Sequence, residues 1–156
     1  MQKIIPFWWF DGNAEEALHF YTSVFKDLKV VNSSRYGDHG PMPKGTLLVA
    51  TIEIFGQQFS LLNGGSDYKF TPAVSFLINC DDQAEVDYYW DKLSEGGQLE
   101  MCGWLRDKFG LSWQVCPTDM LKMINDKDER RVNNVMGAMM KMQKLVIKDL
   151  EVAYNK

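Results

Sequence analysis

The sequence contains one order of predicted elements twice, and this internal duplication restricts the fold more than any other feature. In the first copy, a strand at residues 4–10 leads through a turn into a helix that Asn13 and Glu16 are expected to cap. Three more strands follow, at residues 28–36, 47–54 and 57–63. Glycine permits the tight turn at Phe55-Gly56, which makes the last two strands a hairpin. The first copy is therefore predicted to be a βαβββ module.

The second copy repeats this order. A strand at residues 74–80 precedes a helix that Asp82 is expected to cap and that ends at Gly96-Gly97. Its other strands are predicted at residues 98–101, 103–107 and 111–116. The helix starts are 69 residues apart and the two Phe-Gly turns are 54 apart, so the second copy is the shorter one. We predict a single α+β domain over residues 1–156, with modules at 1–66 and 70–117 and a helical tail at 118–156.

The tail has its own helical pattern. Hydrophobic residues recur at helical spacing at Val132, Val135, Met136, Met139 and Met142, and again at Leu150, Ala153 and Tyr154. Such an amphipathic segment is expected to pack on its own domain or on a second copy of the chain. The alternative is a methionine-rich surface that adapts to a partner.

Composition limits the partners and the compartment. The formal net charge is −4, and the sequence lacks the clustered Lys and Arg of a nucleic-acid-binding surface. No apolar stretch approaches the length of about 20 residues that a membrane span needs. The three cysteines include no CxxC pair, which is typical of a reducing compartment. We therefore expect a soluble, cytoplasmic protein.

Several segments, which together span nearly the whole chain, resemble one family. They are residues 5–17 (IPFWWFDGNAEEA), Phe20-Tyr21, Asn63-Gly64-Gly65, residues 72–76 (PAVSF) and residues 102–114 (CGWLRDKFGLSWQ). These segments resemble the PhnB-like branch of the glyoxalase/bleomycin-resistance superfamily, also called the vicinal oxygen chelate superfamily. The resemblance implies a curved, mixed sheet of eight strands around a cleft, and usually a homodimer. In some members of the superfamily, modules of two chains build the cleft.

This branch often carries the description "3-demethylubiquinone-9 3-methyltransferase-like". A nucleotide-type cofactor usually binds at a glycine-rich turn between a strand and a helix. Here that turn is Asp11-Gly12-Asn13 and has no GxGxxG pattern. The sequence therefore predicts no cofactor and gives the methyltransferase description no support.

Strand parity predicts which side chains line the cleft. Successive side chains of a strand point to opposite faces, so each predicted strand has two sets. One set is apolar and is expected to lie under the helices, and the other is mixed and is expected to face the cleft. The mixed set gives the candidate ligand-binding residues Trp8, Thr51, Ser60, Ser75 and Gln114. Trp8 is expected to form an apolar wall, and the other four are expected to make hydrogen bonds.

Metal-dependent relatives place one metal ligand on each of four strands. By resemblance, these positions fall at Pro6, Ser60, Ser75 and Gln114, and the spacing between the two copies agrees. A divalent ion needs imidazole nitrogens or anionic oxygens, whereas proline has no donor atom and the other three side chains are neutral. The sequence therefore predicts no metal site of the superfamily type.

Three hypotheses of function follow. We favour metal-free binding of a small molecule in the cleft. The first alternative is an enzyme, with unrecognised metal ligands or with Glu53 as a general base. The second alternative is a homodimeric interaction protein whose cleft is filled by Trp8, Phe10 and Leu62. Cys116 also falls on the cleft side, but no histidine lies near it to form a thiolate, so it is expected to be a structural thiol.

Overall fold

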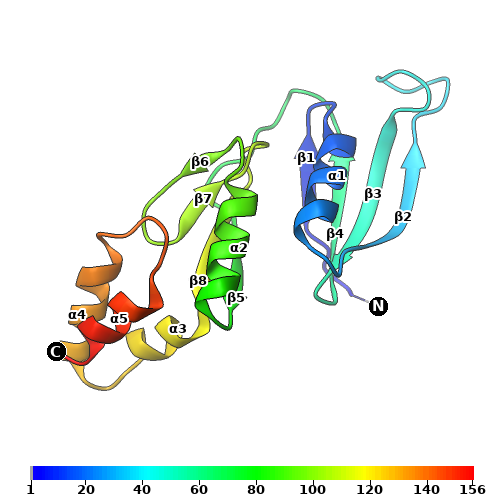
Figure 1. Ribbon diagram of the computed structural model, residues 1–156. Helices are drawn as coiled ribbons and strands as arrows, with labels where there is room; N and C mark the ends of the chain where they lie inside the picture. Colours follow the sequence, from blue (N-terminus) through cyan, green and yellow to red (C-terminus); the bar gives the residue numbers. More distant parts are fainter. Residues whose placement is uncertain (1) are drawn as a thin grey trace. The chain divides into compact units, whose positions relative to one another are not determined.

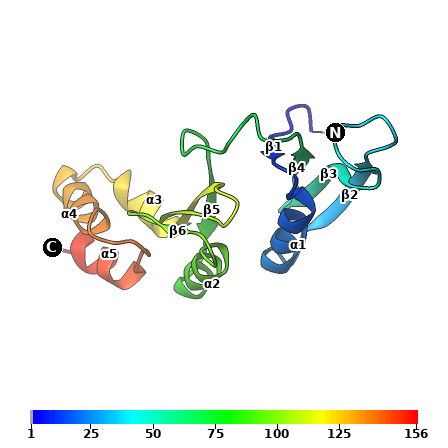
Figure 2. The same cartoon turned by 90° about the horizontal axis from the view of Figure 1, so that it is seen from above.

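The computed structural model describes residues 2–156 and contains two compact units. The first unit ends at Phe70, and the second is Thr71–Lys156. The described residues form eight strands and five helices, and none of these helices is long and apolar enough to cross a membrane. In each unit a helix lies against a four-stranded sheet (Figures 1 and 2).

The first unit is a βαβββ module, as the sequence predicts. Its elements are β1 (Phe7–Phe10), α1 (Ala14–Val24), β2 (Lys29–Arg35), β3 (Leu47–Ile54) and β4 (Gln57–Asn63). The strand order is β1-β4-β3-β2, with β1 parallel to β4 and the other neighbours antiparallel. The bounds of β3 and β4 agree with the predicted hairpin around Phe55-Gly56. Both turn residues have positive φ there, as a tight hairpin turn requires.

The second unit repeats the module and carries the tail. Its module consists of β5 (Ser75–Cys80), α2 (Gln83–Leu93), β6 (Gln98–Leu99), β7 (Trp104–Arg106) and β8 (Ser112–Pro117). The strand order β5-β8-β7-β6 matches that of the first unit, and β5 is again parallel to β8. The repeated topology confirms the α+β class and the duplication.

The tail forms three helices that pack on the second unit. They are α3 (Thr118–Ile124), α4 (Glu129–Met139) and α5 (Ile147–Tyr154), of which the sequence pattern had predicted the last two. Their buried cluster consists of Cys116, Met120, Val135, Leu145 and Leu150. Gln83 of α2 ties the tail down, because its side chain donates to the Leu145 carbonyl and accepts from the Ile147 N–H. The tail thus packs on its own chain through an apolar core.

The two module helices begin differently. The Asp82 side chain accepts a hydrogen bond from the Glu85 N–H, as predicted. Asn13, by contrast, makes no side-chain cap, so that prediction is wrong. The buried side chain of Asn63, at the end of β4, accepts instead from the Ala14 N–H at 2.9 Å. A residue distant in sequence therefore satisfies the first free N–H of α1.

Candidate functional site

The strand register shows which face of the first sheet each side chain occupies. Phe7 is paired with Ser60 in the parallel ladder, so these two side chains share a face, and Trp8 points to the other one. Trp8 is only 2% exposed, stacks on Phe59 and meets Tyr21 of α1 edge-on. The predicted orientation of Trp8 toward a cleft is therefore wrong, because Trp8 belongs to the core under α1.

Phe10 follows the same parity as Trp8 and is equally buried, so neither side chain plugs a cleft. The cause of the wrong assignment is one residue in a turn. Residues 11–13 separate β1 from α1, whereas only residues 81–82 separate β5 from α2. The 69-residue spacing between the helix starts therefore does not relate positions in β1 to positions in β5. A shift of one residue exchanges the two faces of a strand. Gly12, with φ of 81°, lies in the longer turn.

We call the face of each sheet opposite α1 or α2 its open face. On the open face of the first unit, Thr51 lies directly across from Ser60, and their hydroxyl oxygens are 3.1 Å apart. The pairing of Glu53 with Gln58, the next pair on this face, also matches the predicted register. Leu62 lies on the same face, partly buried. A neutral, hydrogen-bonded pair thus lies beside apolar surface.

Besides the exposed Phe7, this open face carries the aromatic side chain of Trp9. It is partly buried, shares its face with Leu62 and donates from Nε1 to the Gly65 carbonyl at 2.7 Å. A Cβ at Gly64 would overlap the Trp9 ring, so glycine is needed there. The motif Asn63-Gly64-Gly65 therefore caps α1 and holds Trp9 in place.

The open face of the second unit carries a second neutral pair. Gln114 lies across from Leu77 of β5, and its Nε2 donates to the Ser75 Oγ at 2.8 Å. On the other side of β8, Trp104 is the residue directly across from Gln114. Four of the five candidate residues thus form two hydrogen-bonded pairs, Thr51 with Ser60 and Ser75 with Gln114. The fifth, Trp8, lies in the core.

The predicted metal positions do not form an anionic set. Pro6 precedes β1, and its carbonyl accepts from the Ser60 N–H, while Phe7 is the residue paired with Ser60. Within residues 2–156, no group of three or more His, Cys, Asp or Glu side chains is arranged to hold a metal ion. Glu53 is partly exposed and lies 4.0 Å from the Lys29 Nζ. No acid or base partner beyond this surface ion pair accompanies Glu53 in the described structure.

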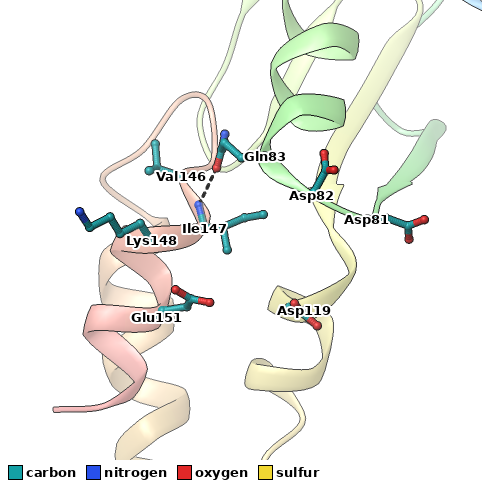
Figure 3. Close-up of a pocket in the computed structure, with 8 residues that line it drawn as sticks. All are labelled: Asp81, Asp82, Gln83, Asp119, Val146, Ile147, Lys148 and Glu151. Atoms are coloured by element: carbon teal, nitrogen blue, oxygen red, sulfur yellow. Dashed lines mark hydrogen bonds between the residues drawn. The ribbon is translucent and has the colours of Figure 1, made fainter.

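A pocket of about 610 Å³ lies in the second unit, where the tail meets the start of α2 (Figure 3). It is lined by Asp81, Asp82, Gln83, Asp119, Val146, Ile147, Lys148 and Glu151. Several of its polar groups already serve the fold: Asp82 caps α2, Gln83 holds the start of α5 and Asp119 pairs with Lys122. We therefore interpret this pocket as part of the packing interface between the tail and the module of the second unit.

The hairpin between β7 and β8 depends on a residue that sequence reasoning missed. Asp107 is 3% exposed, and its Oδ1 accepts from the N–H groups of Phe109 and Leu111 at 2.9 and 3.1 Å. Its Oδ2 accepts from the Trp113 Nε1 at 2.9 Å. An Asp that begins a turn ending in glycine is a recognisable signal for such side-chain to backbone bonds. Asp107 therefore fixes the geometry of the strands that carry Gln114 and Arg106.

The three thiols are expected to differ in reactivity. Burial raises the pKa of Cys80 to about 12 and that of Cys116 to about 11. Because only the thiolate is a strong nucleophile, both should resist iodoacetamide near neutral pH, and the partly exposed Cys102 should react first. Peptide mass spectrometry of briefly labelled native protein measures the order. All three should react in denaturant, and native labelling of Cys116 as fast as Cys102 would contradict this burial.

Taken with its topology, the pair of βαβββ units defines the class of this protein as the glyoxalase, or vicinal oxygen chelate, fold. A family model described as 3-demethylubiquinone-9 3-methyltransferase matches residues 2–116. The chain therefore belongs to this PhnB-like family. The matched region ends before α3, so the three tail helices lie outside it.

Solved structures agree with this assignment. A protein from Bacillus cereus, described as a 3-demethylubiquinone-9 3-methyltransferase and PhnB protein, is 38% identical, with a TM-score of 0.69 over 75% of this chain and 100% of its own. A Pseudomonas aeruginosa protein is 23% identical, with a TM-score of 0.62 over 75% and 98%. The fosfomycin resistance protein FosX from Listeria monocytogenes is 13% identical, with a TM-score of 0.57 over 80% and 98%. The last two show the shared fold alone. A comparison with curated proteins finds no match.

Proposed function

We propose that the open face of each sheet can bind a small organic molecule, without a metal ion. The observation that carries the proposal is the pair of neutral, partly buried polar contacts, Thr51 with Ser60 and Ser75 with Gln114. Each pair lies beside apolar side chains, and a few polar groups in apolar surroundings are what a small-molecule site requires. Hydroxyl and amide groups suit an organic ligand better than a divalent ion.

We also propose, from the resemblance to the family, that the chain forms a homodimer. β1 and β5 are each an end strand of their four-stranded sheet, and sheet edges are normally covered. A cytoplasmic location is part of the same proposal, supported by the three free thiols. Native mass spectrometry of freshly purified protein reports the number of chains, any bound ion and any retained small molecule together.

Replacing Gln114 by leucine or Ser60 by alanine is expected to weaken binding of a ligand found in this way. Each change removes hydrogen bonds, so the dissociation constant should rise about threefold to tenfold. Isothermal titration calorimetry of the retained molecule measures the change.

The matched control is Gln57→Ala, since Gln57 is exposed on the same strand as Ser60 but has the opposite parity. This variant should bind as the wild type does. Equal affinity in Gln114→Leu, Ser60→Ala and the wild type would contradict the proposal. So would a stoichiometric metal ion whose removal by a chelator releases the small molecule.

A further inference from the structure

Ser112 is an unusual hydroxyl on the open face of the second unit. It is fully buried, and its Oγ has no hydrogen-bond partner within residues 2–156. Its cross-strand neighbours are Ser75 on β5 and Arg106 on β7, so all three side chains share this face. Buried polar groups are nearly always hydrogen-bonded. The Ser112 hydroxyl therefore suits a partner that comes from outside the chain.

Arg106 lies directly across from Ser112, and only the Nε of its guanidinium group makes a hydrogen bond to a described residue. Its Nε donates to the Glu100 Oε1 at 2.7 Å, and both side chains are partly buried. The two terminal nitrogens of Arg106 make no hydrogen bond to any described residue. These nitrogens form the fork that matches two oxygens of a carboxylate or phosphoryl group. Glu100 thus orients the guanidinium and leaves its fork available.

The remaining polar groups of this face supply further donors. The Ser75 oxygen accepts from Gln114, which leaves its own O–H proton for another acceptor. The acidic group that contacts Arg106 is Glu100. The next carboxylate in the sequence, Asp107, accepts a hydrogen bond from the Trp113 side chain, which lies on the opposite face of the sheet. The face therefore offers an arginine fork and two hydroxyl donors.

We propose that the open face of the second unit binds an oxyanion, namely a carboxylate or phosphoryl group of the ligand, between Arg106, Ser112 and Ser75. This inference rests on the proposed function and deepens it by naming the ligand class. Arg106 is the charge anchor, and the two serine hydroxyls complete the hydrogen bonds. Because Glu100 partly neutralises Arg106 and the net charge is −4, a bare anion binds weakly and the organic part of the ligand adds affinity.

The test uses inorganic phosphate and acetate as separate probes of the full-length protein, with chloride at matched ionic strength as the blank. Two-dimensional ¹H–¹⁵N NMR follows the backbone signals of Ser112 and Arg106 and the Arg106 Nε–H. We expect saturable shifts at these signals with at least one of the two anions. The anion that binds more tightly identifies the group as phosphoryl or carboxylate.

Variants separate this site from general charge effects. Arg106→Gln should raise the dissociation constant about tenfold or more, and Ser112→Ala about threefold to tenfold. Arg106→Lys keeps the charge without the fork and should give a loss between those of Gln and the wild type. Lys108→Gln removes a cation two residues away and should change nothing. The NMR spectrum of each variant also shows whether the chain is folded.

The inference would be overturned by any of three results: shifts that do not saturate, an Arg106→Gln affinity equal to that of the wild type, or a loss of affinity in Lys108→Gln equal to that in Arg106→Gln. An ordered water molecule would then be the hydrogen-bond partner of Ser112. Such a result leaves the proposed function intact if Gln114→Leu still weakens binding of the retained molecule. Conversely, if Gln114→Leu and Ser60→Ala bind that molecule as tightly as the wild type does while Arg106→Gln loses the anion, the anion site stands and the proposed function fails.

Discussion

Replacing Asp107 by alanine is expected to lower the free energy of unfolding by about 3–5 kcal/mol. The change leaves two buried N–H donors without this acceptor, those of Leu111 and the Trp113 side chain, together with the partly buried N–H of Phe109. Each unsatisfied buried donor costs about 1–3 kcal/mol. Urea unfolding followed by tryptophan fluorescence measures the loss.

Two conservative variants test this explanation. Asp107→Asn keeps one acceptor oxygen but turns an amide N–H₂ toward another donor, so its loss should be smaller than that of alanine. Trp113→Phe removes a single donor, and the cost of Asp107→Asn should shrink in its presence. If alanine at position 107 costs less than about 1 kcal/mol, the carboxylate does not hold the hairpin.

Replacing Trp8 by alanine is expected to cost about 3–5 kcal/mol in the first unit. Trp8 is 2% exposed, with its ring centroid 4.7 Å from that of Phe59 and 5.4 Å from that of Tyr21. Removing the indole leaves a large cavity between β1 and α1, because close-packed neighbours relax only partly. Thermal unfolding monitored by circular dichroism measures the loss.

The neighbouring Trp9 provides the matched control. It lies on the open face, partly buried, and its specific contacts are with the glycine turn and the ring of Tyr68. Trp9→Ala should therefore destabilise the chain less than Trp8→Ala. A larger loss for Trp9 than for Trp8 would mean that the sequence-based parity, with Trp8 on the open side, was correct after all.

Local patterns were sufficient to predict most elements of the fold. Glycine at Phe55-Gly56 and the apolar alternation beside it fixed both strands of the first hairpin to the residue. The short helix α3 was missed because Pro117 and the seven residues after it give too little periodicity to stand out. Element type thus followed from local chemistry wherever the pattern was long enough.

The candidate site could be predicted only in part. Thr51 and Ser60 were correctly paired, because a two-residue turn fixes the register of a hairpin. The roles of Asn63 and Asp107 could not be read from spacing, since each bonds groups brought near by the fold or by a turn. Arg106 was not singled out either, because its importance depends on facing a hydroxyl that has no other partner.

The sequence alone determined the duplication, the class of each module and the neutral character of the polar pairs, because these depend on residue type and on spacing within a strand or turn. The tertiary structure alone decided that Trp8 is buried and Trp9 is not, and that Arg106 lies across from Ser112. The physical reason is that a strand has a period of two residues, so one extra residue in the turn before α1 reverses the faces of β1 without leaving a trace in its composition.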